Sequence, residues 1–320
     1  MELIFTDENR DDVGVLTNAN LDMAIGEDEN NFQLTLNSDD FVLHGKSFIY
    51  VENTEYGGII DKANETSNNE DIVYEGRTWQ GILEKKIIKP LTGNDYYIVN
   101  GEANMVLNSI IDYLELDTIF KASKVNSGIT IKNYQFPRYI NGYKGINKML
   151  RSYGAKLKFK YTAGYVELSA VFLIDYSQDE EWDKNQLTLT ATKKYLDTNH
   201  LVCLGQGELS QRTVVDLYVD DKGKISKTQH FFGYEEITEV YENVNCESVE
   251  TLTEEGINKL EDIISEGEIG TDFDNEKDIY DIGDIVGSRL ELIDQSVSEY
   301  ITKKILKING DDITVECEVG

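Results

Sequence analysis

Apolar and polar residues alternate with a period of two near both ends of the chain, and this pattern predicts β-strands. The segment FQLTLNS places Phe32, Leu34 and Leu36 on one face of a strand, and KSFIYVENTEYGGIID reads as two short strands around a polar turn. Strand patterns return in NHLVCLGQGELSQRTVVDLYVD and again from residue 278 onward. We therefore predict β domains in the first and last parts of the sequence.

The middle of the chain has the helical period instead. Thr78 is a suitable N-cap for a helix that must stop before Pro90, because proline cannot continue a helix. Two further amphipathic helices are predicted in EANMVLNSIIDYLEL and GYKGINKMLRSYG, followed by a hairpin in AKLKFKYTAGYVELSAVF. In this hairpin apolar residues alternate with Lys156, Lys158 and Lys160. The stretch therefore predicts a small α/β domain.

The distribution of charge follows the same division. The chain has 30 basic and 60 acidic residues and a net charge of -30. Residues 1–75 have a net charge of -15, residues 76–172 of +7, and residues 173–320 of -22. A basic segment between acidic flanks indicates a domain inserted into another. The acidic total argues against binding to nucleic acids or anionic membranes, because phosphate contacts need clustered lysine and arginine.

These patterns together predict an α+β, mainly β chain with two barrel-like tube domains, an inserted small α/β domain and a further peripheral helix. We expect the first barrel at residues 1–88, completed by about 173–228, and the inserted basic domain at 89–172. The second barrel takes 229–320 with the peripheral helix at 252–266. No stretch approaches the roughly 18 apolar residues of a spanning helix, and the first residues lack a signal peptide, so we expect no membrane association.

Residues with catalytic or metal-binding chemistry are few. The three cysteines, Cys203, Cys246 and Cys317, lie too far apart to indicate a zinc ribbon. Gly205 and Gly207 lack the third glycine of a dinucleotide-binding loop, so we interpret them as a tight turn or a bulge. The sequence points to no catalytic residue, no cofactor and no metal site.

One acidic segment leaves an alternative open. Asp272, Asp274 and Glu276 resemble the opening of a calcium loop, but Lys277 stands where that loop needs glycine. A solvated loop is the better interpretation, and a weak calcium site within residues 272–284 is the alternative.

The order of several segments along the chain is informative as a whole. These are YEGRTWQGILEKKIIKP, NHLVCLGQGELSQRTVVDLYVD, YEEITEVYEN, YDIGDIVGSRLELID and ITKKILKINGDDITVECEVG. Their order and spacing, over nearly the whole chain, resemble the siphophage-type baseplate hub family of tailed phages and prophages of Gram-positive hosts. The Gly-Arg and short-helix signature of that family maps onto Gly76, Arg77, Trp79 and Leu83, and its Gly-Asp strand maps onto Gly283 and Asp284.

The resemblance implies a structural protein and not an enzyme. Members look like the hub trimer of T-even phages in fold, so we expect a homotrimeric ring that links the tail tube to the tail tip. Expected partners are other tail or baseplate proteins, such as the tail tube or distal tail protein and a spike or tail lysin. The chain would be made in the cytoplasm of a bacterial host and would work in the virion tail. DNA would pass without specific binding along a channel with acidic walls, which repel phosphate.

The resemblance also suggests a role for the tryptophan. Gly76 and Arg77 would end the last strand of the first barrel, and Trp79 would open the helix that leads to the inserted domain. We expect Trp79 to bury on the order of 200 Å² there and, with Leu83, to fix the angle between the domains as a structural joint. Ordinary core packing is the simpler alternative.

The three lysines of the hairpin, Lys156, Lys158 and Lys160, are a candidate interface for an acidic neighbour. A solvated strand face is the simpler explanation of these lysines.

Two other functional classes also stay open. A tail-associated cell-wall hydrolase would need an active site that the sequence does not reveal. A host-surface binding module would present exposed aromatic side chains, for which the 19 tyrosines are candidates.

Overall fold

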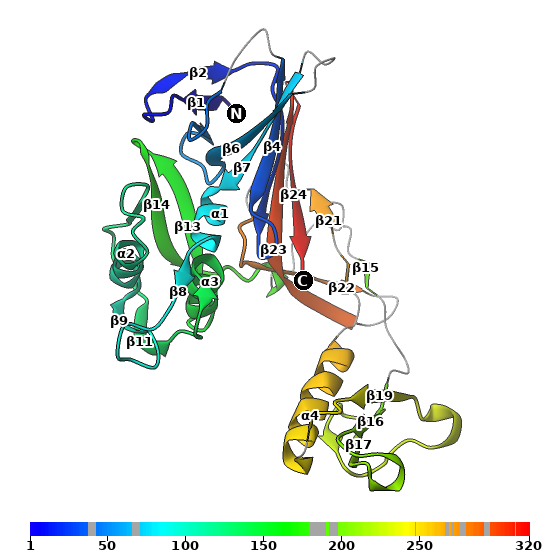
Figure 1. Cartoon of the computed structure of the whole chain (residues 1–320). Coiled ribbons are helices and arrows are strands. Elements are labelled where there is room, and N and C mark those ends of the chain that lie inside the picture. Colours follow the sequence, from blue (N-terminus) through cyan, green and yellow to red (C-terminus); the bar gives the residue numbers. More distant parts are fainter. Residues whose placement is uncertain are drawn as a thin grey trace. The chain divides into compact units, whose positions relative to one another are not determined.

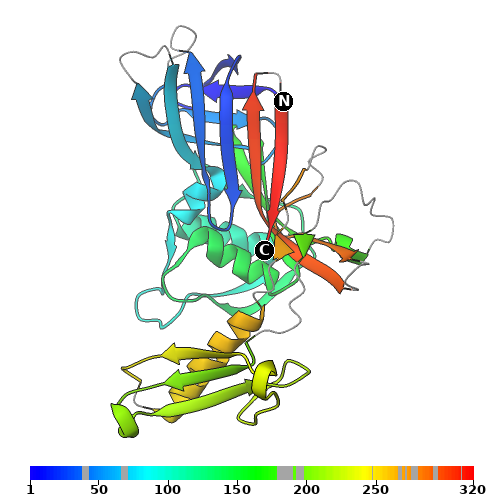
Figure 2. The same ribbon diagram turned by 90° about the vertical axis from the view of Figure 1, so that its right-hand side faces the viewer.

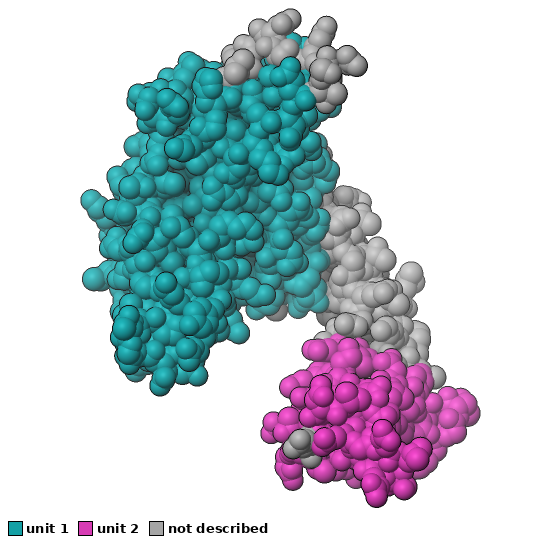
Figure 3. All heavy atoms as spheres, in the orientation of Figure 1, with its two compact units in different colours: residues 1–189, 271–289, 296–320 teal, residues 190–270, 290–295 magenta. Residues whose placement is uncertain are grey.

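A computed structural model (Figure 1) gives the arrangement of most of the chain. It describes residues 1–37, 43–65, 71–178, 190–191, 198–246, 248–265, 269–270, 272–274, 280–290, 295–310 and 312–320. The chain divides into two compact units (Figure 3). Unit 1 comprises Met1–Leu189, Thr271–Arg289 and Ser296–Gly320, and unit 2 comprises Thr190–Gly270 and Leu290–Gln295.

Strands from distant parts of the sequence share the large sheet of unit 1. Its 11 strands follow the order β2-β1-β5-β6-β7-β4-β3-β23-β24-β21, and β22 pairs with β23. The strands are β1 (Leu3–Thr6), β2 (Asp12–Leu16), β3 (Asn20–Gly26), β4 (Asn31–Asn37), β5 (Phe48–Val51), β6 (Gly57–Glu65), β7 (Asp71–Thr78), β21 (Asp272–Asp274), β22 (Ile285–Leu290), β23 (Gln295–Asn309) and β24 (Asp312–Val319). In Figure 2 the blue strands from the start of the chain lie side by side with the red β23 and β24.

Alternation of side chains gives this sheet one apolar face. In β4, Phe32, Leu34 and Leu36 are buried, whereas Asn31 and Gln33 are exposed, as the sequence predicted. The same core cluster takes in side chains from β1, β2, β3, β5, β7, β23 and β24. The sheet therefore packs its apolar face around this core cluster, and side chains of β22, β23 and β24 contribute to a smaller separate one.

A second core in unit 1 belongs mainly to the α/β part at residues 79–172. Its elements are α1 (Trp79–Glu84), β8 (Ile87–Ile88), β9 (Ile98–Glu102), α2 (Ala103–Tyr113), β10 (Phe120–Ala122), β11 (Thr130–Gln135), β12 (Ile140–Asn141), α3 (Gly142–Arg151), β13 (Ala155–Thr162) and β14 (Tyr165–Phe172), followed by the short 3-10 helix η1 (Tyr176–Gln178). The hairpin of β13 and β14 forms a three-stranded sheet with β10. Helix α2 buries Val106, Leu107, Ile110 and Ile111, the positions that its spacing predicted.

The described residues of unit 2 include a four-stranded sheet in the order β18-β17-β16-β19 and the α-helix α4. Its elements are β15 (Thr190–Ala191), β16 (His200–Leu204), η2 (Leu209–Gln211), β17 (Val214–Val219), β18 (Ile225–Ser226), η3 (Gly233–Glu235), β19 (Thr238–Glu242), α4 (Val249–Ser265) and β20 (Ile269–Gly270). Leu201, Cys203 and Leu217 on one face of the sheet share a core with Leu252 and Leu260 of α4.

The α+β, mainly β architecture is confirmed, and α4 corresponds to the further helix expected at 252–266. The strands are grouped differently from the predicted domain boundaries. Residues 200–219, within the segment predicted to complete the first barrel, lie in the sheet of unit 2, and β21 to β24 complete the first sheet instead. The physical reason is that a period of two identifies a strand but not the distant strand with which it pairs.

Candidate functional site

Four of the residues singled out by the sequence, Gly76, Arg77, Trp79 and Leu83, lie where β7 leaves the large sheet and enters α1. Thr78 is the N-cap, and its Oγ1 accepts a hydrogen bond from the Gly81 N–H at 3.2 Å. Trp79 and Leu83 of α1 are both fully buried. This short helix therefore connects the large sheet to the α/β part.

Trp79 packs between the two parts of unit 1. Its ring meets Phe48 of β5 edge-on, with ring centroids 5.1 Å apart. It also stacks on Tyr161 of β13 at 5.5 Å and an interplanar angle of 10°. Burial raises the pKa of Tyr161 to about 12, so its phenol stays neutral inside this aromatic cluster. Trp79 thus binds a strand of the sheet to the hairpin of the α/β part.

Glycines allow the backbones around Trp79 to approach closely. A Cβ atom at Gly57 would lie 2.7 Å from Trp79 Nε1. A Cβ atom at Gly76 would lie 2.0 Å from the carbonyl oxygen of Ile59. Both distances are shorter than van der Waals contact, so these positions require glycine.

Arg77 clamps a β-bulge in β6. The register between β6 and β7 shifts between Ile60 and Lys62, which leaves Asp61 as the extra residue. Arg77 Nε donates to Asp61 Oδ2 at 2.7 Å, and Arg77 Nη2 donates to Asp61 Oδ1 at 2.8 Å. The backbone N–H of Arg77 donates to the same carboxylate at 3.2 Å. This bidentate pair fixes the end of the strand from which α1 starts.

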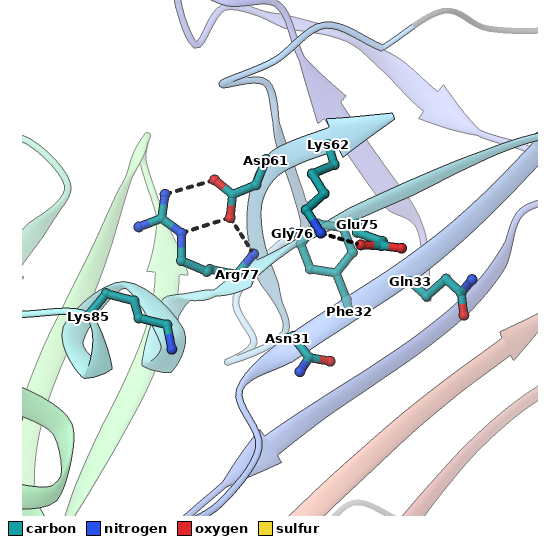
Figure 4. A pocket seen from close by; sticks show the side chains of 9 residues that line it. All are labelled: Asn31, Phe32, Gln33, Asp61, Lys62, Glu75, Gly76, Arg77 and Lys85. Carbon is teal, nitrogen blue, oxygen red and sulfur yellow. Dashed lines mark hydrogen bonds and ion pairs between the residues drawn. The ribbon is translucent and has the colours of Figure 1, made fainter. Parts of the chain in front are cut away.

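A surface hollow of about 540 Å³ lies beside this clamp (Figure 4). Its lining residues are Asn31, Phe32, Gln33, Asp61, Lys62, Glu75, Gly76, Arg77 and Lys85. The charged side chains among them form ion pairs, Arg77 with Asp61, Lys62 with Glu75 and Lys85 with the neighbouring Glu84. The hollow therefore offers paired charges and amides rather than a nucleophile activated by a base.

Gly283 and Asp284 lie in a turn immediately before β22. Gly283 has a φ of +92°, a left-handed conformation that favours glycine. The fully buried Asp284 carboxylate accepts a hydrogen bond from the Ile174 N–H at 2.7 Å. It also forms an ion pair with Lys156 Nζ at 2.7 Å. The turn is thereby fastened to the hairpin of the α/β part.

The three lysines of the predicted interface differ in exposure, and Lys156 is buried. The Lys156 side chain is only 5% exposed, and besides Asp284 it pairs with Asp281 at 2.9 Å. Lys158 is half exposed and pairs with Asp281 at 2.9 Å, and Lys160 is exposed. The turn at residues 281–284 covers Lys156. The alternation of apolar and polar residues in the hairpin cannot predict contact with a segment that is so distant in sequence. Lys156 therefore does not belong to an exposed basic face.

Gly205 and Gly207 lie in the connection that follows β16 and precedes β17. Gly205 N–H donates to the Thr213 carbonyl oxygen at 2.8 Å, and Gly207 has a φ of +110°. Glu276 and Lys277 of the predicted calcium-loop alternative lie outside the described residues. Within the part of the chain that the structure describes, no group of three side chains could hold a metal ion. Nor does any described helix have the length and apolar character needed to span a membrane.

Sequence patterns missed a polar cluster in unit 2. The imidazole of His200 lies between two carboxylates, 2.7 Å from Glu236 Oε1 and 2.9 Å from Asp216 Oδ1. Its ring stacks on Tyr218 with centroids 4.3 Å apart. The cluster joins β16, β17 and the segment before β19. Glu236 comes from outside the paired strands, so no local spacing signals the contact.

Comparisons with known proteins bear on the fold as a whole. No family model and no curated protein matches the sequence. Among solved structures, the chain is similar to the prophage MuSo2 43 kDa tail protein from Shewanella oneidensis, with a TM-score of 0.54 and 10% identity over 100% of this chain and 98% of that chain. It is also similar to the prophage tail protein gp18 from Listeria monocytogenes EGD-e, with a TM-score of 0.50 and 10% identity over 99% of this chain and 94% of that chain. The chain therefore has a fold like that of these prophage tail proteins.

We expect Trp79→Ala to lower the free energy of unfolding by about 3–5 kcal/mol, because it removes a large ring from contact with Phe48 and Tyr161. Urea denaturation followed by circular dichroism measures the change. Trp79→Phe keeps an aromatic ring at the same position and should lose less. Equal losses for the two variants would contradict the prediction that ring contact with Phe48 and Tyr161 stabilises unit 1.

We also expect unit 1 to lose stability in acid through Asp281. Burial raises the pKa of this carboxyl, but Lys156 and Lys158 outweigh burial and hold the pKa below its usual value. Such a group contributes stability that is complete above its unfolded-state pKa of about 4 and is lost as the pH falls through the folded-state value. Thermal unfolding between about pH 3 and 7 should therefore show a weaker acid dependence for Asp281→Asn than for the natural chain.

The matched control for this experiment is Asp117→Asn, at an exposed position of unit 1. It should leave the pH dependence unchanged. An Asp281→Asn variant with the same acid dependence as the natural chain would show that this carboxylate does not control the loss.

Proposed function

We propose that the chain is a structural protein of a phage tail, a prophage tail or a phage-tail-like particle, and that it forms the baseplate hub at the tail tip. The observation that carries this proposal is the similarity in fold to two prophage tail proteins over nearly the full length of each chain. At 10% identity this similarity concerns the fold, and the tail role is the function that the two proteins' names suggest for it.

The interactions of the singled-out residues support a scaffold and not an enzyme. Arg77 clamps a bulge, Trp79 packs two parts of unit 1 together, and Asp284 neutralises a buried lysine. Each of these contacts fixes the position of one element against another. In this proposal Gly76, Arg77, Trp79 and Leu83 are the joint that sets the angle between the sheet and the α/β part.

The finer proposal concerns assembly. Three copies form a ring that links the tail tube to the tip, with other tail or baseplate proteins as neighbours. The net charge of -30 supports a channel with acidic walls. Carboxylates repel phosphate over about the 8 Å screening length at physiological salt, so DNA passes without specific binding. The family that the sequence resembles is the siphophage-type baseplate hub family of phages and prophages of Gram-positive hosts.

Electron microscopy of the purified chain tests this proposal, alone and after mixing with the tail-tube protein of the same particle. We expect class averages with a three-fold ring around an open channel, because a closed cyclic contact satisfies every copy. The molecular mass in solution should correspond to three chains. Monomers under both conditions would contradict the ring.

Exposed aromatic side chains in unit 2 favour host-surface binding as a second candidate function. Phe232 is 64% exposed and Tyr234 is 88% exposed, and both lie in the segment around η3. Exposed aromatic rings are enriched at binding surfaces. If they bind a wall polymer, the natural chain should sediment with purified cell walls and the double variant Phe232→Ala, Tyr234→Ala should not.

Tyr139→Ala is the matched control, since Tyr139 is 63% exposed but belongs to unit 1. It should sediment like the natural chain. If the natural chain itself stays in solution, the host-surface candidate fails and the hub proposal is unaffected.

A further inference from the structure

A buried amide in α1 has no partner among the described residues. Gln80 follows Trp79 and is only 1% exposed. Neither its Oε1 nor its Nε2 forms a hydrogen bond within the part of the chain that the structure describes. A glutamine amide has two donors and two acceptor lone pairs, and buried amides nearly always satisfy at least one of them. The Gln80 side chain therefore points to a bound group.

The surroundings of Gln80 identify where such a group fits. Gln80 lines a small hollow of about 10 Å³ inside unit 1. The hollow is also lined by Glu55, Lys156, Lys158 and Asp281, so several polar side chains converge on it. Its volume is at the lower limit for a single water molecule, and a buried water needs two to four polar partners.

The charges around the hollow favour a neutral occupant. Lys156 and Lys158 both pair with Asp281, and Glu55 forms an ion pair with Lys304 at 2.6 Å. A cation in the hollow would meet the ammonium groups, and an anion would meet the carboxylates. A water molecule carries no net charge and can both donate and accept hydrogen bonds.

We propose that this hollow binds one water molecule, which joins the Gln80 amide to the ion network around Lys156. Lys156 uses two of its three N–H donors on Asp281 and Asp284 and has the third for the water oxygen. The water donates to the nearby carboxylates. Either end of the Gln80 amide can complete the set, because water accepts from Nε2 and donates to Oε1.

With this water site, α1 has two different contacts with the rest of unit 1. Trp79 makes an apolar contact through Phe48 and Tyr161, and Gln80 makes a hydrated contact through Lys156. The hydrated contact reaches the turn at residues 281–284 through Asp281, which lines the same hollow. The site depends on the fold of unit 1 and not on the proposed role in a tail.

Gln80→Met tests the proposal through the sign of its effect on stability. Methionine has a similar length and no polar amide. If a water molecule satisfies the amide, the substitution removes those hydrogen bonds, and we expect the melting temperature to fall by about 2–4 °C. If the amide has no partner, its replacement by an apolar group should leave the melting temperature unchanged or raise it, which would overturn the proposal.

Gln33→Met is the matched control, because Gln33 is an exposed glutamine on β4 of the same unit. Its melting temperature should equal that of the natural chain. If Gln33→Met lowered the melting temperature as much as Gln80→Met, the loss in Gln80→Met would not be due to the small hollow beside Gln80.

A crystal structure of the full chain at high resolution gives a second readout. We expect a density peak within about 2.7–3.2 Å of Lys156 Nζ and of the Gln80 amide. A Gln80 amide hydrogen-bonded directly to a protein group, with no peak in the hollow, would overturn the proposal.

Discussion

The pairing of β23 with β3 is the constraint on which unit 1 depends. It is antiparallel and runs from Lys303 opposite Gly26 to Asn309 opposite Asn20. The backbones are so close that a Cβ atom at Gly26 would lie 2.7 Å from the Thr302 carbonyl oxygen. This ladder brings the late strands into the sheet that the early strands begin. The α/β part and unit 2 therefore lie, in sequence, between strands of one sheet, and the chain is not a series of consecutive independent domains.

Charge pairing explains how so acidic a chain holds its parts together. Lys304 is 1% exposed and pairs with Glu55 at 2.6 Å, and Lys156 is nearly as buried. A buried ammonium is tolerated only with a carboxylate beside it, so each of these lysines specifies a partner more than it adds stability. Lysines used in this way do not offset carboxylates on the surface. Because each of these lysines is buried together with the carboxylate beside it, the pairs leave the net charge of the exterior of unit 1 nearly unchanged.

Local features of the fold could be predicted from the sequence, whereas features that need a distant partner could not. The N-cap at Thr78 and the buried face of α2 follow from neighbours in sequence, and the structure has both. The burial of Lys156 depends on Asp281 and Asp284, and the bulge at Asp61 depends on the register of two strands. The periodicity of apolar residues predicts neither the burial of Lys156 nor the bulge at Asp61. The resemblance in the order of segments identified Gly283 and Asp284, but only the structure shows that Asp284 forms an ion pair with Lys156.

The β3–β23 ladder also has a consequence for the synthesis of the chain. A ribosome makes β3 early, but the strand that covers its edge exists only after residue 303 has been joined. Until then β3 presents an unpaired edge, which is the kind of surface through which unfinished proteins aggregate. Unit 2 and the α/β part have cores of their own and can fold during this interval. The large sheet is completed only after β23 has been translated. A prematurely terminated chain would therefore keep the edge of β3 unpaired.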